Sequence, residues 1–482
     1  MEKKYEEKLN EMKRRFSKMD DLIVREVDLG GKMIAIIYIS NFCSKDMISR
    51  QILFPLREAL NAAGEVEKTE SIITSAAVNT VSSAQEAEEM LLSGSAVVIE
   101  DRPDIFAVTV AVKNEEGRTG NEPETENVIR GPHEGFTESG EANAMLLRRR
   151  IRSTGLKKEV FKIGDRSRTD VALMYIEGIA DEKVIDEVRR RLYAIRIDGV
   201  ADSGIIETYI QDGIRPIYPT VGNSERPDKV AAKILEGRAA IIVDGSPVVL
   251  TVPYLFCEGF QVAEDYSKST WYAGFIRLLR LFSYFLALYL PAIFVALEVK
   301  HHELMAPQIA DAVDKARENL PFSVFWEVIV IFLIFEIVRE VGLRMPKAVG
   351  SAVGLVGSLI LGDSAIEAGV ASAPVLIVVA LAAVCNFIVP PYMHPNILYR
   401  FIMIIVSGTF GLFGFFAGVF IGFAVMASKS SFGVPYFYPF APISVEGMKD
   451  FPIMTPIWEM TKVPRAIVSK DITRAKRKEE KQ

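Results

Sequence analysis

The stretch FIMIIVSGTFGLFGFFAGVFIGFAVMAS, residues 401–428, contains no Asp, Glu, Lys or Arg and decides the fold class. About 20 consecutive apolar residues are enough for a helix to cross a bilayer, so we expect this stretch to span a membrane once. Two further charge-free segments precede it, at residues 281–297 and 368–399, and Pro390 and Pro391 are expected to end the second one early. These segments predict an all-α polytopic membrane domain.

The rest of the chain has the composition of a soluble protein. Charged residues are dense up to Asp265 and sparser after Arg280. The net charge of -6 over 482 residues argues against nucleic acid as the main partner. Three isolated cysteines and four histidines show no spacing typical of a disulfide framework or a metal site, so we expect no cofactor and no metal.

The first membrane entry is internal and follows Lys268, Arg277 and Arg280. Basic residues that flank a span tend to stay in the cytoplasm, so the N-terminal half is predicted to be cytosolic. Residues 1–21 are charged and lack an apolar h-region, which argues against a signal peptide.

Strand and helix patterns alternate in this half and predict two small α/β subdomains. Each ends with a helix that stops at glycine, Gly94 or Gly237, and enters an apolar strand with an acidic turn. This similarity favours two related units, although any α/β unit can produce it. The expected organisation is subdomain 1 at 1–112, a polar linker at 113–127, subdomain 2 at 128–270, the membrane domain at 271–428 with four or five helical spans, and a basic tail at 429–482.

Some elements can be predicted individually. We expect an exposed amphipathic helix over 1–20, a strand over 33–39 and a helix over 79–92. Asp181 is expected to cap a helix, and Asp244-Gly245 to turn a hairpin.

Four arginines, Arg148, Arg149, Arg150 and Arg152, form a basic patch at the end of a predicted helix. They could hold phosphate or anionic lipid head groups, or carboxylates of a neighbouring subunit, or simply form a solvated helix face. No catalytic pairing is evident, and the sequence has no GxxxxGK[ST], GxGxxG after a strand, or GxSxG motif. We therefore expect no enzymatic activity.

Several motifs carry a resemblance to a known family. They are RGPHEGFTES (130–139), LLRRRI (146–151), VALMYIEG (171–178), SERPDKV (224–230), RENLPF (317–322), REVGLRMP (339–346) and SFGVPY (431–436). Together they resemble the A subunit of GerA-type spore germination receptors. The family also includes a paralogous protein of the late germination operon of spores, and both branches stay open here.

The resemblance implies a multi-pass protein of the inner membrane of bacterial spores. It implies a permease-like B subunit that binds the nutrient and a lipoprotein C subunit as partners, with contacts to membrane lipid. It also implies a homo-oligomer that forms an ion channel opened by the germinant.

The number of candidate spans and the charge of the C-terminal tail disagree about how often the chain crosses the membrane. Candidates lie at about 275–298, 320–338, 348–362, 369–389 and 401–427. Five full spans would place the tail outside, yet residues 462–482 carry eight Lys or Arg against three acidic residues. The positive-inside rule therefore favours an even number, with the second or third candidate at the interface or re-entrant.

Ionisable residues inside a membrane segment are costly and indicate function or pairing. Glu327 and Glu336 are nine residues apart, so on a regular helix they face opposite sides; Glu336 could instead pair with Arg339. In a ring of subunits, Asp363 and Glu367 would form an acidic collar that attracts cations. The alternative is that these acids simply face water.

Small residues fill two of the candidate spans. Gly354, Gly357 and Ser358 suit a narrow pore wall or close helix packing. The glycines at 411, 414, 418 and 422 favour helix packing.

The favoured function is therefore a subunit of a germinant-gated cation channel. A secondary transporter is the first alternative, but the membrane part is small and shows no inverted pair of broken segments. A non-conducting receptor scaffold or sensor is the second.

Overall fold

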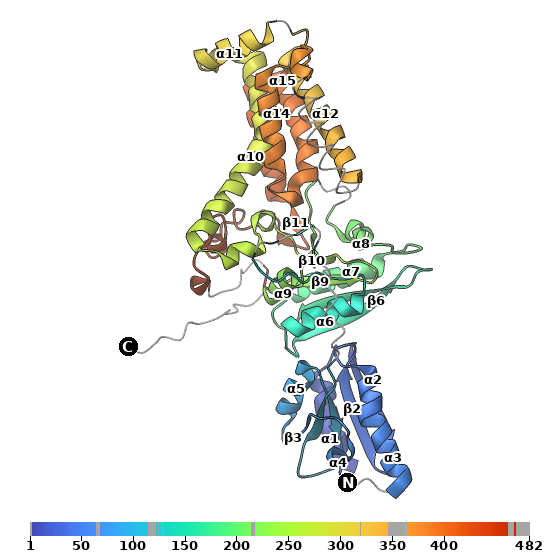
Figure 1. Cartoon of the computed structure of the whole chain (residues 1–482). Helices are drawn as coiled ribbons and strands as arrows, with labels where there is room; N and C mark the ends of the chain where they lie inside the picture. The colour runs from blue at the N-terminus through green and yellow to red at the C-terminus, as the bar shows by residue number, and fades with distance from the viewer. Residues whose placement is uncertain are drawn as a thin grey trace.

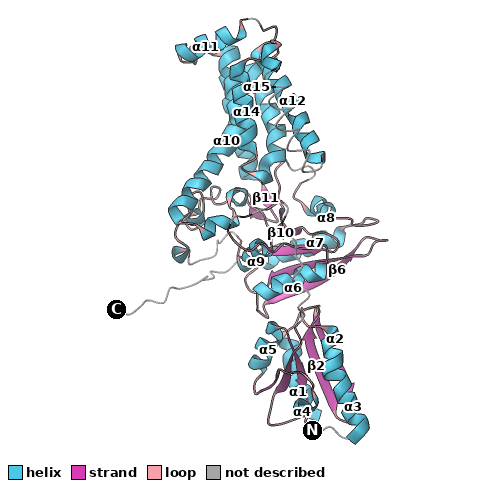
Figure 2. Cartoon of the chain, in the orientation of Figure 1, coloured by secondary structure: helices cyan, strands magenta, loops and turns pink. Residues whose placement is uncertain are grey.

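The computed structural model in Figure 1 describes residues 2–63, 68–113, 122–123, 125–126, 128, 130–213, 217–318, 320–345, 362, 364–460 and 467–468. Two α/β units lie below a bundle of long helices, and Figure 2 shows that the strands gather in the two units. The prediction of an α/β N-terminal half followed by an all-α part is confirmed.

Each unit contains a five-stranded sheet in which the neighbouring strands are antiparallel. The first sheet consists of β1 (Leu22–Asp28), β2 (Met33–Ile39), β3 (Val78–Val81), β4 (Ser95–Ile99) and β5 (Ala107–Ala111) in the order β1-β2-β4-β5-β3. The second consists of β6 (Leu156–Ile163), β7 (Thr169–Ile176), β8 (Gly222–Ser224), β9 (Ala239–Val243) and β10 (Val249–Val252) in the order β6-β7-β9-β10-β8.

The two strand orders are the same once the strands are numbered within each unit. In both units the central strand, β4 or β9, is buried along its whole length. Helices therefore cover both faces of each sheet, and the shared order supports two related units.

The helices of the N-terminal half cover the sheets as follows. In the first unit, α1 (Glu2–Arg15) and α5 (Ala84–Ser93) pack on one face, and α2 (Lys45–Ile48), the π-helix η1 (Ser49–Leu53), α3 (Phe54–Ala63) and α4 (Thr69–Ile72) on the other. In the second unit, α7 (Glu182–Ala194) and α8 (Ser203–Ile210) pack on one face, and α6 (Gly140–Arg150) and α9 (Pro227–Leu235) on the other.

Local sequence signals explain where several of these helices and strands begin or end. Asp181 accepts a hydrogen bond from the Lys183 amide, and Gly94 closes α5 with a φ of 97°, as predicted. The hairpin across Asp244-Gly245 is also confirmed, since β9 pairs with β10.

Two expectations are corrected. Residues 79–92 are not one helix, because Val78–Val81 pairs with β5 as strand β3 before Ser83 caps α5. The N-terminal helix is not merely exposed. Tyr5, Leu9, Met12 and Phe16 recur at helical spacing and are buried against the first sheet.

Long helices form the second part of the molecule. They are α10 (Thr270–Lys300), α11 (Pro307–Arg317), α12 (Val324–Arg344), α14 (Ala373–Asn386) and α15 (Met393–Ser428), with short 3₁₀ turns η3 (Phe256–Phe260), η4 (Ala263–Ser267), η5 (His302–Leu304), η6 (Pro390–Tyr392), η7 (Gly447–Asp450) and η8 (Ile457–Glu459). As predicted, α14 ends before Pro390 and Pro391. We call the end of the bundle beside the α/β units proximal and the opposite end distal.

Helix α15 folds back on itself at Gly411, which has φ 63° and ψ -145°. The Tyr399 hydroxyl donates to the Gly418 carbonyl at 2.7 Å, whereas residues 19 apart on one straight helix would be about 28 Å apart. Gly414 lies against Phe410, Gly418 against Met403, and Gly422 against Tyr399. The expectation of a single span over 401–427 is therefore wrong, because this stretch belongs to a helical hairpin.

The hairpin also confirms that its glycines serve packing, here between its own two arms. Its turn lies at the distal end, where Gly411 contacts Lys300 and His301 at the end of α10. Both arms then run between the two ends of the bundle, and the chain returns after Ser428 to the proximal end. The small hairpin β11 (Ser430–Ser431) and β12 (Val434–Pro435) follows there.

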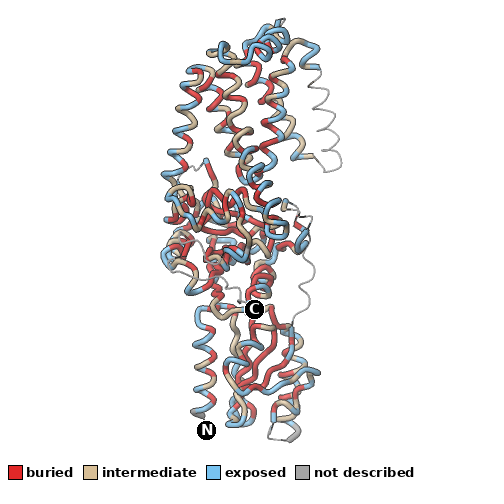
Figure 3. The backbone as a smooth tube through the Cα atoms, turned by 90° about the vertical axis from the view of Figure 1, so that its left-hand side faces the viewer, coloured by how far each residue is buried: buried red, intermediate tan, exposed pale blue. Residues whose placement is uncertain are grey.

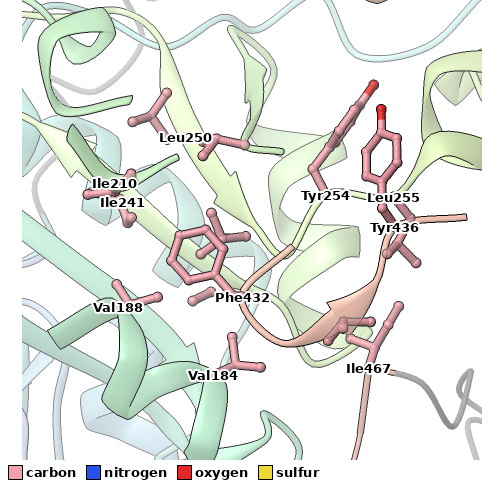
Figure 4. Close-up of a cluster of buried hydrophobic side chains, with 14 of the residues drawn as sticks. Val184, Val188, Ile210, Ile241, Leu250, Tyr254, Leu255, Phe432, Tyr436 and Ile467 are labelled. Carbon is pink, nitrogen blue, oxygen red and sulfur yellow. The ribbon is translucent and has the colours of Figure 1, made fainter. Parts of the chain in front are cut away.

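One hydrophobic core joins the second α/β unit to the base of the bundle. Figure 4 shows Phe432, Tyr436 and Ile467, from the C-terminal part of the chain, among side chains of α7, β9 and β10. Figure 3 shows buried backbone running through this level of the molecule. The C-terminal segment is thus part of the fold of the second unit.

Candidate functional site

The candidate site is the junction where the second α/β unit meets the proximal end of the bundle. Aromatic rings from separate segments meet there: Phe256 of η3, Tyr284 of α10 and Tyr392 of η6. The Phe256 and Tyr392 rings stack with centroids 5.2 Å apart, and the Tyr392 hydroxyl donates to the Phe256 carbonyl at 2.5 Å. The close approach depends on Gly259, since a Cβ there would enter the Tyr392 ring.

A buried ionic cluster lies beside these rings. Asp265 of η4 accepts from Arg277 at 2.9 Å and from Arg280 at 2.7 and 2.9 Å, and both arginines belong to α10. Arg277 also pairs with Asp450 of the C-terminal segment at 2.7 Å. The Arg277 side chain is fully buried, and so is almost all of Asp265. The cluster therefore fixes the first turns of α10 to segments on either side of it.

The environment sets the protonation of the two acids differently. Burial disfavours the Asp265 carboxylate, but the two guanidinium groups outweigh that cost and hold its pKa below the usual range. Burial dominates at Asp450 and raises its pKa in spite of Arg277.

A second buried cluster anchors η3 to the sheet. Glu258 pairs with Lys233 of α9 at 2.9 Å and with Arg238 at 3.0 Å, and it accepts from the Leu255 amide at 2.9 Å. Burial opposes ionisation of Glu258, and the charges of Arg238 and Lys233 overcome this and lower its pKa. The chain that leads from the sheet into α10 is thus held by two charge clusters.

The predicted pore residues lie elsewhere. Glu367 is exposed at the distal end, just before α14. Gly354, Gly357, Ser358 and Asp363 lie outside the described residues. The acidic collar and the pore wall therefore stay predictions.

The two acids of α12 have different surroundings. Glu327 is buried and accepts from the Ser372 amide and from its hydroxyl at 2.6 Å, so it caps the start of α14 from a neighbouring helix. Arg317 lies 3.4 Å from the same carboxylate. Glu336 pairs with Arg339 at 2.9 Å, which is the alternative predicted for it.

The predicted basic patch is corrected for Arg148. Its guanidinium is buried and pairs with Asp21 of the first unit at 2.8 Å, so it cannot serve an external partner. Arg150 pairs with Glu134 at 2.7 Å, and Arg149 lies 3.9 Å from the same residue. Arg152 is exposed.

Sequence reasoning missed most of the junction. Arg277 and Arg280 were noted only as flanking charges, although their spacing places both on one side of a helix. It also missed Arg400, which is buried in the bundle with its guanidinium 4.8 Å from the Phe332 ring. An isolated arginine between apolar runs is the signal that would have found it.

The fold and the junction define a class of protein: an α/β half joined through a buried core to a helical part. Within the part of the chain that the structure describes, two helical stretches are long and apolar enough to cross a membrane by length and composition: Thr270–Lys300, and Pro390–Ser428, which includes both arms of the α15 hairpin. Among the described residues, no group of three or more His, Cys, Asp or Glu side chains could hold a metal ion.

Comparison with known proteins gives the family. The family model described as Bacillus/Clostridium GerA spore germination protein matches residues 10–466, and the chain belongs to this family. It is 38% identical to spore germination protein KA of Bacillus subtilis (strain 168), over 96% of this chain and 87% of that protein. It is 32% identical to spore germination protein GerLA of Bacillus cereus, over 97% and 96% of the two chains.

Two further relatives complete the comparison. The uncharacterized membrane protein YfkQ of Bacillus subtilis (strain 168) is 37% identical over 92% of this chain and 87% of its own. The solved N-terminal domain of the A subunit of the Bacillus megaterium spore germinant receptor GerK3 is 31% identical, covers 52% of this chain and 94% of its own, and gives a TM-score of 0.41. The family and its named relatives support a role in spore germination.

Proposed function

We propose that this chain is the membrane subunit of a nutrient germinant receptor in the inner membrane of bacterial spores, and that copies of it assemble into a germinant-gated cation channel. Its partners in this proposal are a permease-like B subunit and a lipoprotein C subunit. We assign it no catalytic step.

One observation carries the gating part of the proposal. The second α/β unit holds both the first helix of the bundle and the segment that follows the last one. Asp265, in the segment that connects this unit to α10, binds Arg277 and Arg280. The Tyr284 hydroxyl of α10 lies 3.5 Å from the Tyr218 hydroxyl of the unit. Asp212 accepts from the Phe432 amide at 2.9 Å, four residues after α15 ends. A movement of this unit would therefore act on both helices together, as a gate requires.

The hairpin of α15 supports a multi-pass topology. With its turn at the distal end, the tail returns to the proximal end, beside the predicted cytosolic half. This arrangement brings the chain that leads into the basic tail to the predicted cytosolic side, as the positive-inside rule favours.

Conductance measurements test the proposal. The chain is reconstituted into liposomes with its B and C partners, and a germinant is added. We expect a cation current that falls severalfold in Glu367→Gln and in Asp363→Asn, because the acidic collar would no longer attract cations.

Glu303→Gln is the matched control, since Glu303 is an exposed acid at the distal end of α10. If the cation current fell equally in Glu303→Gln and Glu367→Gln, the acidic collar would be refuted and a general surface-charge effect would explain the loss. Absence of any current with partners and germinant present would favour the non-conducting scaffold.

A further inference from the structure

The base of α10 extends beyond the rest of the bundle. Residues Tyr284 and Phe285 lie beside Met426 and Phe423 near the end of α15, whereas Thr270–Phe282 continues past that level. Figure 1 shows this part of α10 leaning away from the bundle axis, next to the C-terminal segment. This projection therefore has its own surface.

One side of the projection is apolar and exposed. Trp271, Phe275, Leu278 and Phe282 recur at spacings of three and four residues, so they share one helix face, and Trp271 is 90% exposed. The other side of the helix holds Ala273 and Arg277, which are buried. The exposed face is thus left without a covering element among the described residues.

The C-terminal segment adds to this surface. A Cβ on Gly274 would lie 3.4 Å from the Ile453 side chain, and Arg277 pairs with Asp450, so the segment packs directly on α10. Its exposed apolar residues are Ile443, Val445, Ile453 and Trp458. These four and Trp271, Phe275, Leu278 and Phe282 make up what we call the proximal apolar surface.

We propose that the proximal apolar surface rests in the interfacial layer of the bilayer, so that the C-terminal segment is a membrane-surface anchor. The proposal rests on membrane insertion of the bundle, as given under the proposed function. It assigns a lipid contact to a segment that does not span the membrane.

Three features favour lipid as the occupant. The bundle itself exposes apolar side chains, such as Phe413 and Phe420 of α15, which would face lipid. Tryptophan and tyrosine concentrate at bilayer interfaces, where an apolar ring and a polar edge are both accommodated. The segment from Gly447 to Glu459 contains 3₁₀ turns, and such irregular backbone suits the hydrated interface rather than the hydrocarbon core.

The length of α10 agrees with this position. Its 31 residues extend about 46 Å at 1.5 Å per residue, while a hydrocarbon core of about 30 Å takes about 20 residues. If Lys300 marks the distal boundary, the proximal boundary falls near residue 280, and the first turns of α10 then lie in the headgroup layer.

The three tryptophans of the chain provide the test. Three single-tryptophan variants, each with the other two replaced by Phe, are reconstituted into vesicles of phosphatidylcholine with bromine near the glycerol or near the chain ends. We expect Trp271 and Trp458 to lose more emission with bromine near the glycerol. The quenching should be unchanged when anionic lipid is added, because the eight residues of the surface are uncharged.

Trp326 separates this inference from the proposed function. It is exposed at the third residue of α12, at the distal end of the bundle, and reports insertion of the bundle itself. Quenching of Trp326 without quenching of Trp271 and Trp458 would overturn the surface anchor and leave insertion intact. Absence of Trp326 quenching would overturn insertion.

A second copy of the chain is the alternative occupant. In that case Trp271 and Trp458 would be shielded from both brominated lipids, and their emission would change when the protein is diluted in lipid. Val445→Asp adds an independent measurement in the Trp458 variant, since a charge there should reduce quenching of Trp458, whereas Val445→Ile should not. Equal quenching in the two variants would contradict the anchor.

Discussion

At the scale of single residues, the junction depends on carboxylates that are buried between arginines. A buried ion pair contributes little when compared with an apolar replacement, but removing one partner leaves the other charge without compensation. Asp265 is such a partner for two arginines at once. The contribution of Asp265 to stability is therefore measured by changing Asp265 alone, and not by replacing the whole cluster with apolar residues.

Asp265→Asn should lower the free energy of unfolding by about 3–5 kcal/mol, because the largely buried Arg280 would lose its carboxylate and the fully buried Arg277 would keep only Asp450. Thermal unfolding in detergent can be followed by the reactivity of Cys43, Cys257 and Cys385, which are buried in the fold. Glu264→Gln is the control, since its pair with Lys268 lies nearer the surface and contributes about 0–1 kcal/mol. Equal losses of stability in Asp265→Asn and Glu264→Gln would contradict the special role of the buried cluster.

The pH dependence should follow Glu258. Its pKa in the folded protein is depressed, so its contribution is fully present above the unfolded pKa of about 4.3 and is lost as pH falls through the folded pKa. The stability difference between the natural protein and Glu258→Gln should therefore be constant from about pH 6 to 8 and shrink below about pH 4.5. If the stability difference instead grew as the pH falls, the assigned direction of the Glu258 pKa shift would be wrong.

Residue-scale features were the hardest to predict from the sequence. Arg148 and Arg152 stand in one basic run, yet Arg148 is buried against Asp21 while Arg152 is exposed. Nothing in the local pattern separates them, because the distinction depends on a partner 127 residues away. The pair of Glu336 with Arg339 was predicted as an alternative because both residues lie within one turn.

At the scale of elements, the hairpin of α15 decides how the chain crosses the bundle. Its turn has a backbone conformation that essentially only glycine adopts. Gly411→Ala should cost about 1–3 kcal/mol or more, because the new Cβ would lie 2.8 Å from His301 and 2.9 Å from Lys300. Thermal unfolding in detergent measures the change.

Gly342→Ala is the matched control for that substitution. Gly342 lies within α12, and a Cβ there meets no atom within 4 Å. This change should stabilise the helix by up to about 1 kcal/mol, since alanine is the better helix former. A loss of stability as large as that of Gly411→Ala would contradict the special role of the turn.

The hairpin also predicts which side of the membrane each residue faces. Thr409 lies next to the distal turn and Ser430 follows the proximal end, and both are exposed. Thr409→Cys and Ser430→Cys should therefore react with an impermeant maleimide from opposite sides of oriented vesicles. In a single straight span over 401–427, residue 409 would be buried in the bilayer and would not react.

The apolar character of this stretch was evident from its sequence, but its reversal was not. Glycine is a common turn residue, but a glycine within an apolar run is equally typical of close helix packing, so the sequence alone did not identify the turn. Gly411, Gly414, Gly418 and Gly422 form a pattern that indicates close helix packing. The prediction that these glycines serve helix packing was correct, but they pack the two arms of one hairpin against each other.

At the scale of the whole molecule, a shared hydrophobic core joins the second α/β unit to the bundle, and a buried ion pair joins the two units. The units share a strand order that the sequence only suggested, through similar glycine stops at Gly94 and Gly237. The order of strands in a sheet depends on contacts distant in sequence, which explains why the layout was predicted and the topology was not. The segment Ser17–Asp21 also pairs with the edge of β6.

The Arg148–Asp21 pair should couple the two units. Arg148→Met and Asp21→Asn should each cost about 3–5 kcal/mol, and the double variant should cost clearly less than the sum, because the second change removes the charge left unpaired by the first. Thermal unfolding of all four proteins measures the coupling. Arg152→Met should leave stability within about 0.5 kcal/mol, and additive losses would show that the pair does not connect the units.

Helix α10 has a mechanical consequence at this scale. It is held at its base by Asp265 and Asp450 and continues to Lys300 as one helix with Pro291 in its interior. Over its length of about 46 Å, a rotation of about 5° at the base would displace the distal end by about 4 Å. The helix is therefore a lever, and a rearrangement in the α/β unit too small to disturb its core would move the far side of the bundle by more than the width of a water molecule.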